Sequence, residues 1–147
     1  MKKIFLILIA LPALVYSQDI PKGAIRVFPD AIQWISPPNL PAGAKTALLE
    51  GNFMQEGIFT MRVKFPPYYK LPAHWHPMDE RATVLEGAIY VGFGDVMDTT
   101  SAERFTAGCY YVNPKDSHHY VFTQSEGVIF QVTGLGPWGL NYIEDKK

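Results

Sequence analysis

Residues 71–87 read LPAHWHPMDERATVLEG, and they place two histidines one position apart, directly before a proline and two acids. Side chains alternate across a β-strand, so His74 and His76 point to the same side and lie about one strand repeat apart. The alternation resumes after the turn, where Glu80 shares a face with the apolar residues at positions 82 and 84. We therefore expect Glu80, and not Asp79, to face the two imidazoles.

The flanking segments indicate an all-β protein. In residues 58–65, IFTMRVKF, apolar and polar side chains alternate with period two, which predicts one buried and one solvent-facing side. Residues 81–94 suggest two strands joined at Glu86-Gly87, and residues 119–132 suggest a hairpin. After the N-terminal segment no helical period continues for ten residues, so we expect a β-sandwich or β-barrel.

The first 17 residues have the pattern of a secretory signal peptide. Two lysines precede an apolar run from Ile4 to Val15, and the small residue Ser17 follows. This run is shorter than the ~20 residues that a membrane-spanning helix needs. We therefore expect an exported protein, periplasmic or secreted, that begins near Gln18 and has no membrane anchor.

The composition fits one domain and does not suggest nucleic acid as a partner. The chain has 147 residues, 48% of them hydrophobic, which is enough for one core. Its formal net charge is −1, and loss of Lys2 and Lys3 with the signal peptide makes it more negative. The single Cys109 cannot form an intramolecular disulfide, so stability must come from the core, a metal or a subunit interface.

All four histidines fall in two places, the pair His74 and His76 and the pair His118 and His119, each beside a proline-bearing turn. Adjacent residues of a strand face opposite sides, so only one of His118 and His119 can reach the interior, and the local pattern does not decide which. Three imidazoles and one carboxylate suit a divalent transition metal with open positions for water or substrate. The HxH motif alone is weak evidence, because it also fits paired surface histidines.

With these residues in place, the sequence resembles the cupin superfamily. The first cupin motif is HxH, three or four residues, Glu, six residues and Gly, and it is complete from His74 to Gly87. The second motif is Gly, five residues, Pro-x-Gly, two residues, His, three residues and Asn. Here Pro114 is in place, but Asp116 replaces the glycine and Thr123 replaces the asparagine. Asp tolerates a positive φ better than most non-glycine residues, so Asp116 can take that conformation.

The resemblance covers about residues 46–142 and implies a single jelly-roll barrel, or double-stranded β-helix, with the metal inside. The expected organisation is a signal peptide over residues 1–17, a proline-rich N-terminal arm over 18–45 and the cupin barrel over 46–147.

The resemblance also implies the metal ligands, which are His74, His76, Glu80 and His119. Spacing from Pro114 in cupins selects His119 and leaves His118 on the outer face or at an interface. A neutral imidazole ligand commonly donates its other ring nitrogen, so we expect a carboxylate, carbonyl or water behind His119. The sequence does not say whether the metal is zinc, manganese, iron, nickel or copper.

Cupins of this type include dioxygenases, oxidases, decarboxylases and isomerases as well as binding or sensing modules, and the ligand set does not choose among them. We expect a metal-dependent, oxygenase-like enzyme that acts on a small oxygen-rich substrate. The alternative is a non-catalytic, metal-dependent module that binds or senses a small ligand, similar to the cupin module of anti-sigma factors.

Four further residues lie on or beside predicted barrel strands: Tyr90, Tyr111, Gln131 and Trp138. The aromatic ones are more often core than substrate contacts, and Gln131 either faces the cavity or a wet outer surface. Apolar residues in the arm, over 19–43, need a partner surface. A second copy of the chain is the expected partner, giving a homodimer, with the chain's own barrel as the other option.

Overall fold

The protein is described by a computed structural model, which covers residues 19–143. The described chain consists of short strands, and its single helical element is a 3-10 turn, η1 (Pro29–Ala31). The strands are β1 (Lys45–Glu50), β2 (Gly57–Phe65), β3 (Lys70–Trp75), β4 (Glu80–Phe93), β5 (Glu103–Thr106), β6 (Tyr110–Asn113), β7 (His119–Phe122), β8 (Val128–Gly136) and β9 (Asn141–Tyr142). Over these residues no helix has the length and apolar character to cross a membrane. The predicted signal peptide over residues 1–17 lies outside the described range.

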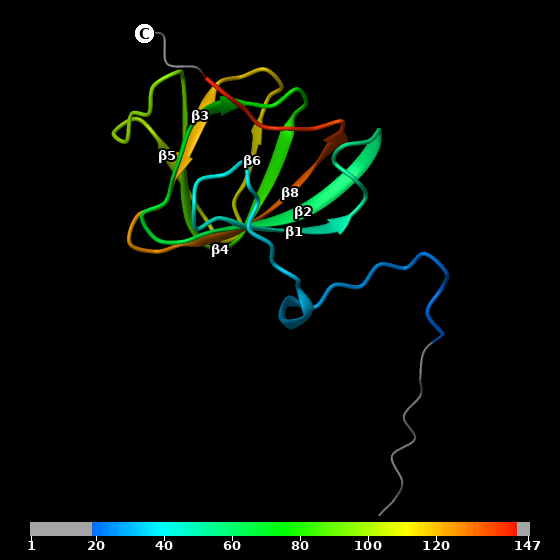
Figure 1. Ribbon diagram of the computed structural model, residues 1–147. Helices are drawn as coiled ribbons and strands as arrows, with labels where there is room; N and C mark the ends of the chain where they lie inside the picture. The colour runs from blue at the N-terminus through cyan, green and yellow to red at the C-terminus, as the bar shows by residue number, and fades with distance from the viewer. Residues whose placement is uncertain (1–18, 144–147) are drawn as a thin grey trace, which may run out of the picture.

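The strands form a curled antiparallel sheet of the jelly-roll type, as Figure 1 shows, so the all-β prediction is confirmed. One side, which we call sheet A, has the order β1-β2-β8-β4-β6, and the other, sheet B, has the order β5-β4-β7-β3-β9. Strand β4 belongs to both sheets. Its residues 80–87 pair with β6 and β8 in sheet A, and residues 88–93 pair with β5 and β7 in sheet B.

The sequence prediction of two separate strands joined at Glu86-Gly87 is wrong. Strand β4 runs unbroken through this point and bends there, with a register shift between Val84 and Glu86. Gly87 has φ 70°, and a Cβ at this position would overlap the carbonyl oxygen of Gly127. Glycine therefore allows the strand to bend from one sheet into the other without ending.

The core lies between the two sheets and follows the predicted alternation of β2. Phe59 and Phe65 at the two ends of this face are almost completely buried, and the alternate side chains point outward. Strands β8 and β4 continue the apolar layer with Val128, Phe130, Val132, Ala82 and Val84. Inward side chains from three neighbouring strands thus form the wall against which the site is built.

The predicted hairpin over residues 119–132 is also wrong, because β7 pairs in sheet B and β8 in sheet A. The turn residues between β7 and β8 indicate that the chain changes direction, but they do not determine which strand each of the two pairs with. The hydroxyl of Thr123 accepts a hydrogen bond from the Tyr69 amide at 2.9 Å and donates one to the Pro66 carbonyl at 2.6 Å. These bonds hold the end of β7 against the connection between β2 and β3, so the chain crosses to the other sheet.

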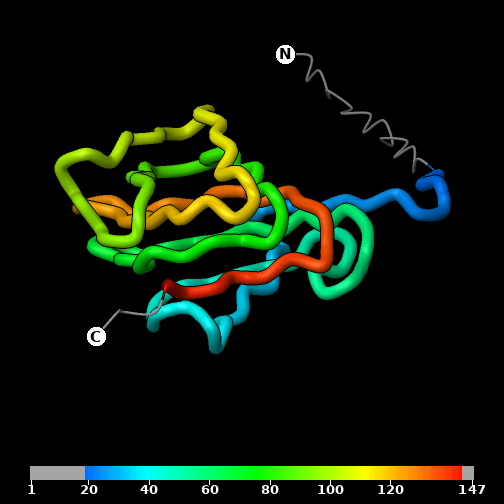
Figure 2. The backbone as a smooth tube through the Cα atoms, turned by 90° about the horizontal axis from the view of Figure 1, so that it is seen from above, coloured from blue at the N-terminus to red at the C-terminus, as the bar shows by residue number. Residues whose placement is uncertain are grey.

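The segment before β1 extends away from the sheets and then returns to them (Figure 1). Ile25 and Phe28 in its outer part are exposed. Its inner part, residues 37–42, lies beside the C-terminal segment, as Figure 2 shows, and Tyr142 donates a hydrogen bond to the Asn39 carbonyl at 2.8 Å. The proposed boundary between arm and barrel near residue 45 remains a prediction.

Candidate metal centre

Strand pairing brings the three histidines together. His74 lies in β3 and is directly opposite His119, the first residue of β7, while His76 follows immediately after β3. Their relative exposures are 2% for His74, 2% for His76 and 0% for His119. One nitrogen atom from each imidazole lies within 4.8 Å of the other two, so the three rings could hold one ion.

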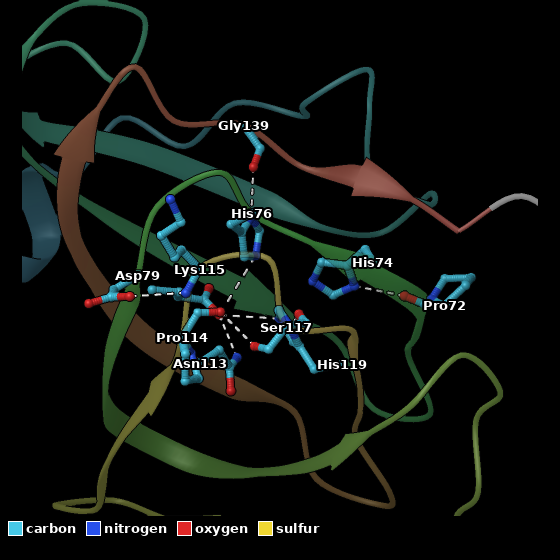
Figure 3. Close-up of polar contacts among 11 residues, drawn as sticks. Pro72, His74, His76, Asp79, Asn113, Pro114, Lys115, Ser117, His119 and Gly139 are labelled. Atoms are coloured by element: carbon cyan, nitrogen blue, oxygen red, sulfur yellow. Dashed lines mark hydrogen bonds and ion pairs between the residues drawn. The ribbon is translucent and has the colours of Figure 1, made fainter.

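Each imidazole is oriented by a backbone carbonyl, as Figure 3 shows. The Nδ1 atoms of His74, His76 and His119 lie 2.7, 2.7 and 3.1 Å from the carbonyl oxygens of residues 72, 139 and 117. A carbonyl can only accept, so each Nδ1 donates its proton, and the Nε2 of a neutral ring is left with a lone pair. The Nε2 atoms of His76 and His119 are buried and have no hydrogen-bond partner within residues 19–143. This donor set fits a metal ion.

Burial favours the neutral, metal-binding form of these rings. It lowers the pKa of His74 from 6.5 to about 3, with a further contribution from His119. Burial also lowers the pKa of His76, despite the opposing effect of Glu80. At neutral pH both rings are therefore uncharged, and a metal ion can bind to them without displacing a proton.

Glu80, the first residue of β4, lies beside the histidine cluster. Its Oε2 atom is 3.5 Å from Nε2 of His119 and 3.8 Å from Nε2 of His76. Burial raises the pKa of Glu80, but the neighbouring His119 and His76 outweigh it and lower the value to about 2. The side-chain amide of Asn113 donates a hydrogen bond to Oε2 at 2.7 Å. Glu80 is therefore a fixed carboxylate.

Asp79 faces away from the cluster, as expected from the strand alternation. Its side chain is partly exposed and accepts hydrogen bonds from Arg81 and from the Lys115 amide at 2.8 and 3.0 Å. This carboxylate therefore joins the two turns from the outside and leaves the interior to Glu80.

The second motif has the register that its spacing predicted. His118 is partly exposed, and its Nδ1 lies 2.6 Å from a carboxylate oxygen of Asp95, so His119 alone of the pair reaches the interior. The expected acceptor behind His119 is the carbonyl of Ser117. Asp116 has φ 60°, and its amide donates to the His76 carbonyl at 2.8 Å. This bond connects the second motif directly to the first.

A cavity of about 120 Å³ opens onto the cluster. Tyr111 and Trp138 line it, and the Trp138 indole stacks on His76 with ring centroids 4.2 Å apart and planes at 15°. Gln131 lies on the outer face of β8, between the buried Phe130 and Val132. Tyr90 is not part of the lining. Two of the four candidates therefore belong to the site.

Sequence reasoning missed two parts of the site. Asn113 could have been found, since it shares a face of the 110–113 strand with Tyr111, as Glu80 does with its apolar neighbours. Residues 37, 39 and 40 of the arm also line the cavity. No local pattern indicated that the arm returns to the mouth of the barrel.

The chain belongs to the ChrR cupin-like domain family, whose profile matches residues 22–138. This confirms the resemblance to cupins, including the module of the anti-sigma-factor type. A search of curated proteins found no significant match.

Several solved structures share the fold. The polyketide cyclase RemF from Streptomyces resistomycificus has a TM-score of 0.68 and 16% identity, over 83% of this chain and 87% of that chain. An RmlC-like cupin from Shewanella frigidimarina has a TM-score of 0.58 and 19% identity, over 74% and 87%. A DMSP lyase from Ruegeria pomeroyi has a TM-score of 0.58 and 18% identity, over 74% and 58%. At these identities the likeness concerns the fold alone, although the neighbours include enzymes.

Proposed function

We propose that the protein is a metal-dependent enzyme with an oxygenase-like reaction on a small substrate. A divalent transition metal would be held by His74, His76, His119 and Glu80. The observation that carries this proposal is the convergence of three imidazoles, each with its Nδ1 engaged by a backbone carbonyl. The Nε2 atoms of His76 and His119 are in addition buried without partners within residues 19–143.

The metal would supply a Lewis acid and, if redox-active, a means of activating dioxygen. The chain contributes the surroundings. Backbone carbonyls fix the ring orientations, and Asn113 holds the Glu80 carboxylate. Burial raises the pKa of Tyr111 well above its usual value, with a further contribution from Glu80, so its hydroxyl remains a proton donor beside the cavity. Apolar side chains make up most of the cavity wall beside the cluster.

The test is oxygen consumption by protein loaded separately with zinc, manganese, iron, nickel or copper. Candidate phenols and diketones serve as substrates in an oxygen electrode, and the His119→Ala variant is the matched control. Turnover is expected with a redox-active metal in the unmodified protein and not in the variant. Metal-dependent binding of these compounds without turnover would instead favour a small-ligand binding or sensing module. The family match to a ChrR cupin-like domain supports that alternative.

We also propose that the protein is exported and forms a homodimer. Export is supported by the sequence pattern of residues 1–17, and dimerisation by the exposed apolar side chains of the arm. Mass spectrometry of protein from the periplasm or medium should give a chain beginning at or near Gln18. A chain that retains Met1 would contradict export through a cleaved signal peptide.

A further inference from the structure

We propose that the cavity binds a compact apolar molecule, about the size of one ring, that carries a single anionic oxygen group directed at the metal. This inference rests on the proposed metal site and names the class of ligand for it. Four observations lead to it: the charge of the site, the chemistry of the cavity wall, the size of the cavity and a buried donor in the wall that lacks an acceptor.

The charge of the donor set leaves room for one negative charge. Three neutral imidazoles and the Glu80 carboxylate around a divalent ion leave a net charge of +1. A buried net charge is costly unless it is paired. One monoanionic group on the ligand would neutralise the site, whereas a second carboxylate would bring an unpaired charge into the cavity.

The rest of the wall offers no charged partner to a second charged group. Within the described residues, no lysine or arginine lines the cavity, and the side chains outside the metal cluster that carry a polar atom are Asn39, Thr46, Tyr111 and Trp138. The remaining wall is apolar and includes Met61, Val63, Leu71, Val121, Phe130 and Val132. A sugar or a dicarboxylate would lose its hydration here without equivalent hydrogen bonds. An apolar body would instead bury its surface favourably.

The cavity volume sets the size of the apolar body. The volume of about 120 Å³ is close to that of an engineered cavity of about 150 Å³ that binds benzene. A single six-membered ring is therefore near the upper limit of the enclosed part.

One buried hydrogen-bond donor in the cavity wall has no acceptor within the described chain. Trp138 lines the cavity and stacks on His76, and its indole Nε1 is buried without an acceptor within the described chain. An indole N–H can only donate, so it suits a ligand oxygen. A carboxylate with one oxygen toward the metal has a second oxygen available for this donor.

The test compares three probes of one ring size by calorimetry: benzoate as the monoanion, terephthalate as the dianion and benzyl alcohol as the neutral molecule. Zinc-loaded protein is used, with metal content measured first. We expect benzoate to bind at least about tenfold more tightly than either other probe, because it alone neutralises the site without bringing a second charge into the cavity. Equal or tighter binding of terephthalate or benzyl alcohol would overturn the proposal, as would equal binding of benzoate to metal-free protein.

A matched pair of variants locates the binding. Val132→Phe fills the cavity from β8, whereas Gln131→Phe adds the same ring to the outer face. Benzoate affinity should fall about tenfold or more in the first variant and remain unchanged in the second, with metal content retained in both. Equal affinity in the two variants would place the ligand elsewhere. If the unmodified protein takes up no metal, the metal site itself is refuted. If it binds benzoate but turns over no substrate, this inference is supported and only the enzymatic proposal is contradicted.

Discussion

The side-chain amide of Asn113, at the end of β6, donates a hydrogen bond of 2.7 Å to the carboxylate of Glu80, at the start of β4. Both side chains are buried, and Oδ1 of Asn113 has no partner within residues 19–143. The amide therefore fixes the carboxylate oxygen that lies beside the Nε2 atoms of His119 and His76. It acts as a positioning residue for the proposed metal ligand.

Asn113→Leu should weaken metal binding about 10- to 100-fold, because a ligand that loses its supporting hydrogen bond is less well oriented. Competition with a chelator measures this affinity. Val112→Ala, the neighbouring substitution on the outer face, is the control and should leave the affinity unchanged. Equal affinities for the two variants would show that Asn113 does not position Glu80.

His119→Ala should lose the metal and His118→Ala should keep it. The first removes a buried ring of the cluster, whereas the second removes a partly exposed ring paired with Asp95. Elemental analysis of the purified variants is the measurement. The reverse pattern would contradict the proposed ligand set despite the geometry.

The metal-free protein should lose stability as the pH falls below about 6.5. His74 has a pKa of about 3 in the folded state against 6.5 ordinarily, so between these values the unfolded chain binds more protons and acid favours unfolding. Glu80, with a pKa lowered from 4.5 to about 2, stabilises the fold above pH 4.5 and loses this contribution below it. The combined loss should reach several kcal/mol.

Thermal melts at a series of pH values measure this dependence. A His74→Leu variant should show a shallower fall between pH 6.5 and 4.5, where Glu80 contributes little. If the slope of stability against pH is unchanged in that variant, His74 is not the source of the loss of stability.

The turn at Asp116 should prefer glycine to alanine. Its φ of 60° lies in the left-handed region, where a Cβ costs on the order of 1 kcal/mol and Asp is tolerated better than Ala. We therefore expect Asp116→Gly to be about 1 kcal/mol more stable than Asp116→Ala in urea unfolding. At the adjacent Lys115, which has no positive φ, the order of the Gly and Ala variants should be reversed. The same order at both positions would exclude this explanation.

The arm should mediate dimerisation through its exposed apolar side chains. Ile25, Phe28 and Ile35 are each more than half exposed, so they are free to pack against a second copy of the chain. Light scattering should give a dimer for the unmodified protein, and Phe28→Glu should shift it toward the monomer. A monomer at high concentration without any substitution would contradict this prediction.

The alternation of residues along the strands was sufficient to predict part of the site from the sequence, but not the rest. Alternation alone placed His74, His76 and Glu80 on inward faces, because each lies in a regular strand or beside one. The choice of His119 over His118 required the spacing of a known family, since both faces of that strand are plausible locally. Asp116 followed from the tolerance of Asp for positive φ.

The remaining features depend on contacts between distant segments. The pairing of β7 and β8 with different sheets is fixed by Thr123 bonds to residues more than 50 positions away. The bend of β4 at Gly87 looks like a turn in the sequence, because glycine serves both purposes. The return of the arm to the cavity depends on partners such as Tyr142, which hydrogen-bonds to the arm from the other end of the chain.

The passage of β4 through both sheets has a kinetic consequence. His74 and His119 meet only when β3 and β7 pair, and Glu80 joins them only when the first half of β4 is in place in sheet A. The complete ligand set therefore does not exist in any fragment that has formed only one sheet. Metal capture should therefore be among the last events of folding. The rate at which refolding protein takes up the ion would then report the closure of the barrel. This closure is slow because the pairing strands are distant in sequence.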